Sequence, residues 1–300
     1  MKKKHNLVDS DGNKLRHEQT KPTTRTLERR KEDSEYIPVI IKRTDEAVRH
    51  PDDTLEKGIE EGLEQYERST ASLLLSSISA GLIIGFAGMC VAIISQFIPS
   101  GENWLLNRLL IALVYPLGFI VCIMSGTQLF TEHTATAVYP VLDKKIKLSS
   151  LFKLLVIVLT GNFIGTFISS LLLYASDNVI MAAAGYVEVS HHLLDFNNTE
   201  VFISAILAGW LMAQGGWLVL ATPPTSSQII CVYIVTFIIG LGGLHHSIAG
   251  SAEIFSGLLH SEHSNYLKSF NFLLFAVLGN LLGGSVFVGV LNYSHIKKTQ

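Results

Sequence analysis

The sequence predicts an all-α membrane protein that crosses the bilayer six times. Its 300 residues are 48% hydrophobic and 16% charged, and the mean hydropathy is +0.37, whereas a soluble chain carries about 25% charged residues. A bilayer core of about 30 Å requires about 20 apolar residues in a helix that crosses it. Six stretches meet this requirement within a predicted transmembrane domain over 69–296: 71–98, 108–142, 149–175, 201–221, 228–256 and 269–294.

The N-terminal part of the chain differs from the rest in composition. Residues 1–50 are polar and hold 13 Lys or Arg against 9 Asp or Glu. Such a segment buries too little apolar surface to offset its ordering entropy, so we predict a disordered cytoplasmic arm. Within residues 51–68, Leu55, Ile59 and Leu63 recur at helical spacing among acidic residues. This pattern predicts an amphipathic helix that packs on the cytoplasmic face of the protein.

The distribution of Lys and Arg predicts the orientation in the membrane. An even number of crossings places both termini on one side, together with the loop Lys144-Lys145-Ile146-Lys147 and the tail that carries Lys297 and Lys298. The loop from Ser176 to Glu200, on the opposite side, contains no Lys or Arg. Because cytoplasmic loops carry the excess of positive charge, we expect both termini to be cytoplasmic.

The last three stretches repeat features of the first three. Gly161-Asn162 in the third stretch matches Gly279-Asn280 in the sixth, and Ala80-Gly81 in the first matches Ala208-Gly209 in the fourth. Each half has an odd number of crossings, so the two halves must be inverted relative to each other. Inverted repeats are typical of transporters and channels, whose solute path lies at the repeat interface.

The middle stretch of each half is interrupted by a polar run. The runs are Ser125–Thr134 in the second stretch and Gly240–Ser247 in the fifth. Unwound backbone at membrane depth is tolerated only where protein buries it or where it lines a wet cavity. Such breaks also direct helix ends, with their partial charges, toward the interior. The two breaks therefore predict the position of a pore.

At these residues the chain resembles the formate/nitrite transporter family. The matching segments are Leu129-Phe130-Thr131, His246-Ser247-Ile248-Ala249 and Gly279-Asn280, and the correspondence runs from about Ser69 to Ser294. The resemblance implies an aquaporin-like six-helix protomer in a bacterial inner (plasma) membrane, assembled into a homopentamer with one pore in every protomer. Members of the family pass small monovalent anions of weak acids, such as formate, nitrite, hydrosulfide, acetate or lactate.

The resemblance also implies roles for individual residues. Leu129 and Phe130 would contribute to apolar constrictions, Thr131 would line the pore at the break, His246 would be the central histidine, and Asn280 its polar neighbour. Physical chemistry supports the histidine role, because a bare anion in an apolar slit faces a large desolvation cost. A histidine there could hydrogen-bond the anion and donate a proton, so that the neutral acid crosses.

Three further residues complete the predicted solute path. Asn162 corresponds to Asn280 in the repeat, Glu132 follows Thr131, and His245 precedes His246. Intramembrane carboxylates are functional candidates, so Glu132 and also Glu253 either relay protons or make structural hydrogen bonds to a helix end.

The sequence departs from the family at the vestibule. Formate and nitrite members typically carry a lysine just before the fourth helix, whereas residues 187–200 contain none and hold His191 and His192. Gly209 and Gly250 stand where the formate channels have asparagines.

Two other classes of function remain as alternatives. An aquaporin-like channel for a neutral solute keeps the fold, but the paired Asn-Pro-Ala signatures of water channels are missing from the sequence. A histidine-rich membrane enzyme needs several histidine boxes on the cytoplasmic side, and the adjacent pairs His191-His192 and His245-His246 do not supply them.

The remaining composition predicts no cofactor. The three cysteines lie far apart in apolar runs, so we expect neither a metal site nor a disulfide framework. The formal net charge of −2 gives no indication of nucleic-acid binding. The expected partners are a small anion or weak acid, the lipid bilayer and further copies of the chain.

Overall fold

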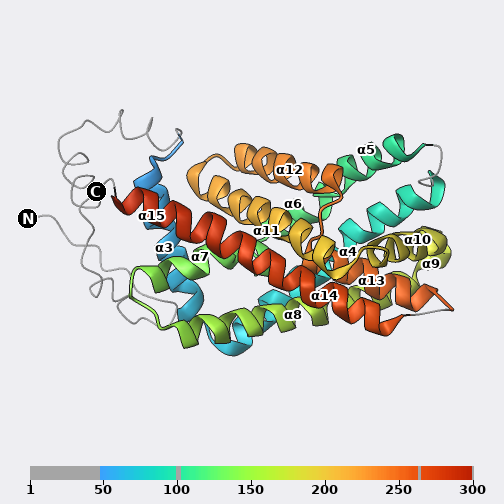
Figure 1. Cartoon of the computed structure of the whole chain (residues 1–300), viewed down its shortest axis with the longest axis horizontal. Helices are drawn as coiled ribbons and strands as arrows, with labels where there is room; N and C mark the ends of the chain where they lie inside the picture. Colours follow the sequence, from blue (N-terminus) through green and yellow to red (C-terminus); the bar gives the residue numbers. More distant parts are fainter. Residues whose placement is uncertain (1–47, 99–102, 263–264, 299–300) are drawn as a thin grey trace, which may run out of the picture. The chain divides into compact units, whose positions relative to one another are not determined.

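The structure is a computed structural model that describes residues 48–98, 103–262 and 265–298. Apart from its last three residues, the predicted arm over 1–50 lies outside these described residues. Every regular element that the structure describes is helical (Figure 1). The predicted all-α class is confirmed.

Six helical spans in the described part of the chain are long and apolar enough to cross a membrane. They confirm the predicted number of crossings. Four spans lie close to the predicted stretches, but the second and fifth end at Met124 and Gly242, well before the predicted ends at 142 and 256, because a break and a separate half-helix follow each of them. The helices are α4 (Thr70–Phe97), α5 with α6 (Trp104–Val114 and Pro116–Met124), α8 (Leu148–Ala175), α11 (Asn198–Ala221), α12 (Thr225–Gly242) and α14 (Tyr266–Leu282), which continues through the π-helical segment η1 (Gly283–Val290) into α15 (Leu291–Lys298).

The second and fifth crossings are each followed by a shorter half-helix after a break. Helix α7 (Phe130–Leu142) follows α6, and α13 (Ser247–His260) follows α12. At each break a glycine has a positive φ, 66° at Gly126 and 58° at Gly243, a backbone conformation that only glycine adopts without steric cost. Both breaks are narrower than the predicted polar runs.

The breaks are narrower than the polar runs because part of each run is helical. Thr131, Glu132 and Thr134 belong to α7, and Ser247 opens α13. All four side chains are buried in protein, where a helix satisfies its own backbone groups and lipid does not reach the polar side chains. Polarity alone therefore overestimated the length of unwound chain.

The two halves correspond in their packing. Helix α4 packs along α8 in the first half, and α11 packs along α14 in the second (Figure 1). The short half-helices cross between the halves, since α7 lies against η1 and α11 whereas α13 lies against α8 and α4. This exchange brings the N-terminal ends of α7 and α13 into the interior.

Glycine allows the paired helices to approach closely. A Cβ atom at Gly81 of α4 would overlap the backbone of Asn162 and Gly165 in α8. The matching Gly209 of α11 meets the backbone of Asn280 in α14 in the same way. Small residues at such crossings are the usual means of close helix packing in membranes.

Two further sets of helices cover the ends of this bundle. The short α9 (Asp177–Ile180) and α10 (Ala183–Leu194) follow α8, and α10 packs against α4 and α13. At the other end, α3 (Pro51–Glu67) packs against α7, where the Tyr66 hydroxyl donates to the carbonyl oxygen of Ala137 at 2.7 Å.

The close packing of α4 and α8 predicts a difference between two alanine variants. We expect Gly81→Ala to lower the thermal unfolding midpoint in detergent, because forced separation of packed elements costs about 1–3 kcal/mol. Gly88→Ala in the same helix is the control, since its Cβ would meet no atom nearer than 3.6 Å. Equal midpoints for both variants would contradict this packing.

Candidate functional site

The two half-helices meet at a hydrogen bond between Thr131 and His246. Thr131 lies in the first turn of α7, and its Oγ1 is 2.6 Å from Nε2 of His246, which caps the N-terminus of α13. Both side chains are buried. The N-terminal ends of two helices, each carrying about half a positive charge, are thus directed to one point inside the protein.

The hydrogen bonds of His246 fix the tautomer of its ring. The backbone N–H of Ala249 donates to Nδ1 at 3.0 Å, so Nδ1 carries no proton. The neutral ring therefore has its N–H at Nε2, which donates to Oγ1 of Thr131. Phe119 from α6 packs edge-on against this ring, with 5.0 Å between the centroids.

Asn162 of α8 holds the beginning of α7 in place. Its Oδ1 accepts from the N–H of Phe130, the first residue of α7, at 2.8 Å. Its Nδ2 donates to the carbonyl oxygens of Ser77 at 2.8 Å and of Gln128 at 2.9 Å. One buried amide thus ties the break of the second crossing to α4 and α8.

Asn280 of α14 makes the equivalent set of bonds in the second half. Its Oδ1 accepts from the N–H of Ser247, the first residue of α13, at 2.7 Å. Its Nδ2 donates to the carbonyl oxygens of Ala205 at 2.7 Å and of His245 at 3.0 Å. Both asparagines have their amide oxygen and nitrogen occupied by backbone groups, and contact of either amide with a solute stays a prediction.

The predicted apolar residues surround the meeting point. Leu129 caps α7 and Phe130 is its first residue, and both side chains are buried in the main core cluster. Phe119 and Tyr115, whose ring centroids lie 4.9 Å apart, belong to the same cluster. The sequence alone does not indicate these two aromatic residues, because aromatic side chains in an apolar helix carry no distinguishing signal.

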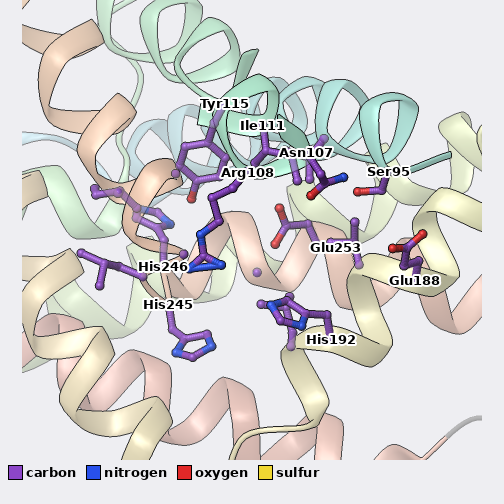
Figure 2. Close-up of a pocket in the computed structure, with 18 of the residues that line it drawn as sticks. Ser95, Asn107, Arg108, Ile111, Tyr115, Glu188, His192, His245, His246 and Glu253 are labelled. Atoms are coloured by element: carbon purple, nitrogen blue, oxygen red, sulfur yellow. The ribbon is translucent and has the colours of Figure 1, made fainter. Parts of the chain in front are cut away.

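A cavity of about 270 Å³ opens beside His246, between α5, α10 and the break before α13 (Figure 2). We call it the Arg108 cavity. His246 forms part of its wall. Most of the remaining wall is apolar, and the other ionisable or amide side chains that line it are Asn107, Arg108, Tyr115, Glu188, His192, His245 and Glu253.

Arg108 was not among the residues that the sequence predicted for this site. It belongs to α5, and its Nε and one terminal nitrogen donate to the carbonyl oxygens of Leu241 at 3.0 Å and Gly242 at 2.8 Å. These two carbonyl groups belong to the last two residues of α12, which ends at the break. The cavity therefore holds a fixed positive charge, although the segment before the fourth crossing contains no lysine.

Two predicted residues of the solute path remain, His245 and Glu132. They lie on different sides of the meeting point. His245 lines the Arg108 cavity, with its ring edge-on to Phe196 and Phe272 at centroid distances of 5.0 and 5.4 Å. Glu132 does not line this cavity; it lies in α7 with Oε2 3.8 Å from Nδ1 of His133. The structure thus separates Glu132 from Glu253, which the sequence grouped as intramembrane acids.

We call the hydrogen bonds of Asn162 and of Asn280 to the two breaks the two clamps. They predict the effect of losing one asparagine. Asn162→Ala leaves the buried N–H of Phe130 without its acceptor, which costs about 1–3 kcal/mol, so we expect a lower unfolding midpoint. Asn271→Ala in α14 is the matched control, because Asn271 faces a surface pocket. Unfolding midpoints measured in detergent test this, and an Asn162 variant as stable as the control would contradict the clamp.

Comparison with known proteins identifies the family of this chain. A profile described as formate/nitrite transporter matches residues 52–294. The chain is 31% identical over 248 residues to the inner membrane protein YfdC of Escherichia coli (strain K12), over 79% of this chain and 76% of that protein.

Two solved structures share the fold. One is described as an FNT family ion channel, with a TM-score of 0.74 and 20% identity over 81% of this chain and 98% of that one. The other is a pentameric formate channel with formate bound, with a TM-score of 0.63 and 20% identity over 76% of this chain and 98% of that one. With its family profile matched over most of its length, this multi-pass membrane protein belongs to the formate/nitrite transporter family.

Proposed function

We propose that this protein transports a small monovalent weak-acid anion, of the formate or nitrite type, across the membrane together with a proton. The observation that carries the proposal is the buried contact between Thr131 and His246 at the meeting point of two half-helices. Membership of the family and the likeness to a formate channel support this class of solute.

The path runs from the Arg108 cavity past His246 to the cytoplasmic side of α7. An anion in the cavity approaches the N-terminal ends of α7 and α13, whose partial positive charge favours it. The N–H at Nε2 of His246 turns from Thr131 to an oxygen of the solute, and the Thr131 hydroxyl becomes a second donor. Two hydrogen-bond donors therefore converge on the solute where it has lost its water.

The apolar part of the path requires that the solute cross without charge. Leu129, Phe130 and Phe119 surround the meeting point with apolar groups, and moving an ion out of water into such surroundings costs several kcal/mol even after relaxation. Protonation of the anion removes most of this cost. We therefore infer a flux of the neutral acid that rises as the external pH falls.

The membrane arrangement is part of the proposal. We infer a bacterial inner-membrane protein with both termini and α3 in the cytoplasm, because Lys144, Lys145 and Lys147 share one side whereas Ser176–Glu200 has no Lys or Arg.

We also propose a homopentamer. Exposed apolar side chains on α5 and α12 require lipid or a neighbouring copy as cover, and the similar formate channel is described as pentameric.

The pentamer predicts the mass of the intact assembly. Native mass spectrometry of the protein released from detergent micelles should give five times the 32.9 kDa chain mass. The exposed apolar faces are then buried between copies, so the assembly should survive dilution below micromolar concentration. A monomer as the main species under these conditions would contradict the proposal.

The central histidine predicts the behaviour of one variant. Asparagine is a good N-cap residue, so His246→Asn should keep the cap of α13 but lose the donor at Nε2. We expect a normal unfolding midpoint and formate uptake into proteoliposomes about 2- to 10-fold lower, the equivalent of one lost hydrogen bond to a neutral solute.

The control for this variant is His191→Asn in α10, an exposed histidine that does not line the Arg108 cavity. Uptake should be followed for formate, nitrite, acetate, lactate and hydrosulfide. Wild-type protein that admits none of these faster than empty liposomes, but admits water or glycerol, would replace the proposal with the neutral-solute channel.

A further inference from the structure

Glu253 is a buried carboxyl group in the wall of the Arg108 cavity. It lies in α13 with 7% of its surface exposed and lines the Arg108 cavity. None of the described residues gives it a hydrogen bond or an ion pair. A carboxyl group at membrane depth without a partner is costly, and the proposed path through His246 does not use it.

The position of Glu253 relates it directly to the proposed path. His246 caps α13, and Gly250 and Glu253 follow at spacings of four and three residues, so the three share one helix face. All three line the Arg108 cavity. Figure 2 shows the Glu253 carboxyl in the space between Arg108 and Glu188. A solute that enters the cavity therefore passes Glu253 on its way to His246.

Arg108 supplies an anion-binding group on the opposite wall. Its guanidinium has five N–H donors, of which two are held by the carbonyl oxygens that end α12. A Cβ at Gly243 would overlap this guanidinium, so the glycine leaves room for the Arg108 side chain at the break. The fixed side chain retains donors for the oxygen atoms of an anion.

His246 is badly placed to supply the proton that the anion needs. Its neutral ring carries one proton, at Nε2, and giving that proton away would leave an imidazolate. A second proton could be added only at Nδ1, where it would oppose the Ala249 N–H that caps α13. His246 can therefore hydrogen-bond a solute readily, but another group must protonate it.

We propose that Glu253 is the proton donor of the Arg108 cavity and that Arg108 holds the anion for this transfer. The inference rests on the proposed function. In the step, the O–H bond of the protonated Glu253 breaks and an O–H bond forms on the bound anion. The products are the neutral acid, which moves on to His246, and the Glu253 carboxylate, which is reprotonated from the solution that fills the cavity.

Other groups around the cavity contribute to its charge. Glu188 and His192 of α10, Arg108 of α5, Tyr115 of the α5–α6 junction and His245 line it together with Glu253. Helix α4 has no charged residue, and the lysines of α8 and α14 lie outside the lining. Ionised Arg108 and Glu253 balance each other, and a proton transfer between two groups inside the cavity does not change the net charge of the cavity.

Removal of the exchangeable proton tests this role. Glu253→Gln is nearly isosteric and cannot donate a proton to the anion, so initial uptake of acetate should fall about tenfold or more between about pH 6 and 8, where the anion dominates. The deficit should shrink as the external pH approaches the acid's own pKa, because undissociated acid then enters directly. Arg108→Gln should instead raise the half-saturating concentration.

The matched control is Glu262→Gln, an exposed carboxyl just after α13. If the wild type takes up the acid and Glu253→Gln has the same rate and pH profile, the Glu253 role is overturned but the proposed function stands. Absence of wild-type uptake overturns both. Should the Gln variant not fold, Glu253→His replaces it: a pH profile with a displaced midpoint supports proton transfer at this position, and an undisplaced one overturns it.

Discussion

A helix that is broken inside a bilayer leaves backbone N–H and C=O groups where water cannot satisfy them. In this protein, the side-chain amides of Asn162 and Asn280 take over that task at the two breaks. Each amide binds the first N–H of a half-helix, a carbonyl of the adjacent unwound chain and a carbonyl of a neighbouring full-length helix. The proposed solute path depends on these two clamps.

The clamps explain how two half-helices can point at one another. Helices α7 and α13 each pack against the other half of the protein, and their positive ends would repel each other without fixed partners. The contact between Thr131 and His246 joins them. The same construction leaves the cap of α13 dependent on Nδ1 of His246. We therefore assign hydrogen bonding to that ring and the proposed proton transfer to another group.

Much of this arrangement could be predicted from the sequence, because it depends on composition and repeats. Long apolar stretches predicted the crossings, polar interruptions predicted the breaks, and the matched Gly-Asn pairs predicted the inverted repeat. Thr131 and His246 could be selected because a polar residue inside an apolar stretch stands out. The extent of each break could not be read from polarity, since a buried helix such as α7 also carries polar side chains.

The residues that were missed depend on tertiary contacts. Arg108 stands at the start of a crossing, where an arginine ordinarily faces headgroups, and its role follows from carbonyls more than 130 positions later in the chain. Phe119 has an ordinary apolar sequence context and acquires a role only by packing against His246. Likewise, the repeat identified both asparagines, but only the three-dimensional contacts assign their amides to the backbone.

The central claim is that the solute crosses the meeting point of α7 and α13 as a neutral acid. The most direct test is simultaneous measurement of labelled formate and internal pH in proteoliposomes that contain the full wild-type chain. The account predicts that one proton enters with each formate and that an imposed membrane potential does not change the rate. Formate entry without acidification, at a rate that follows the membrane potential, would contradict it.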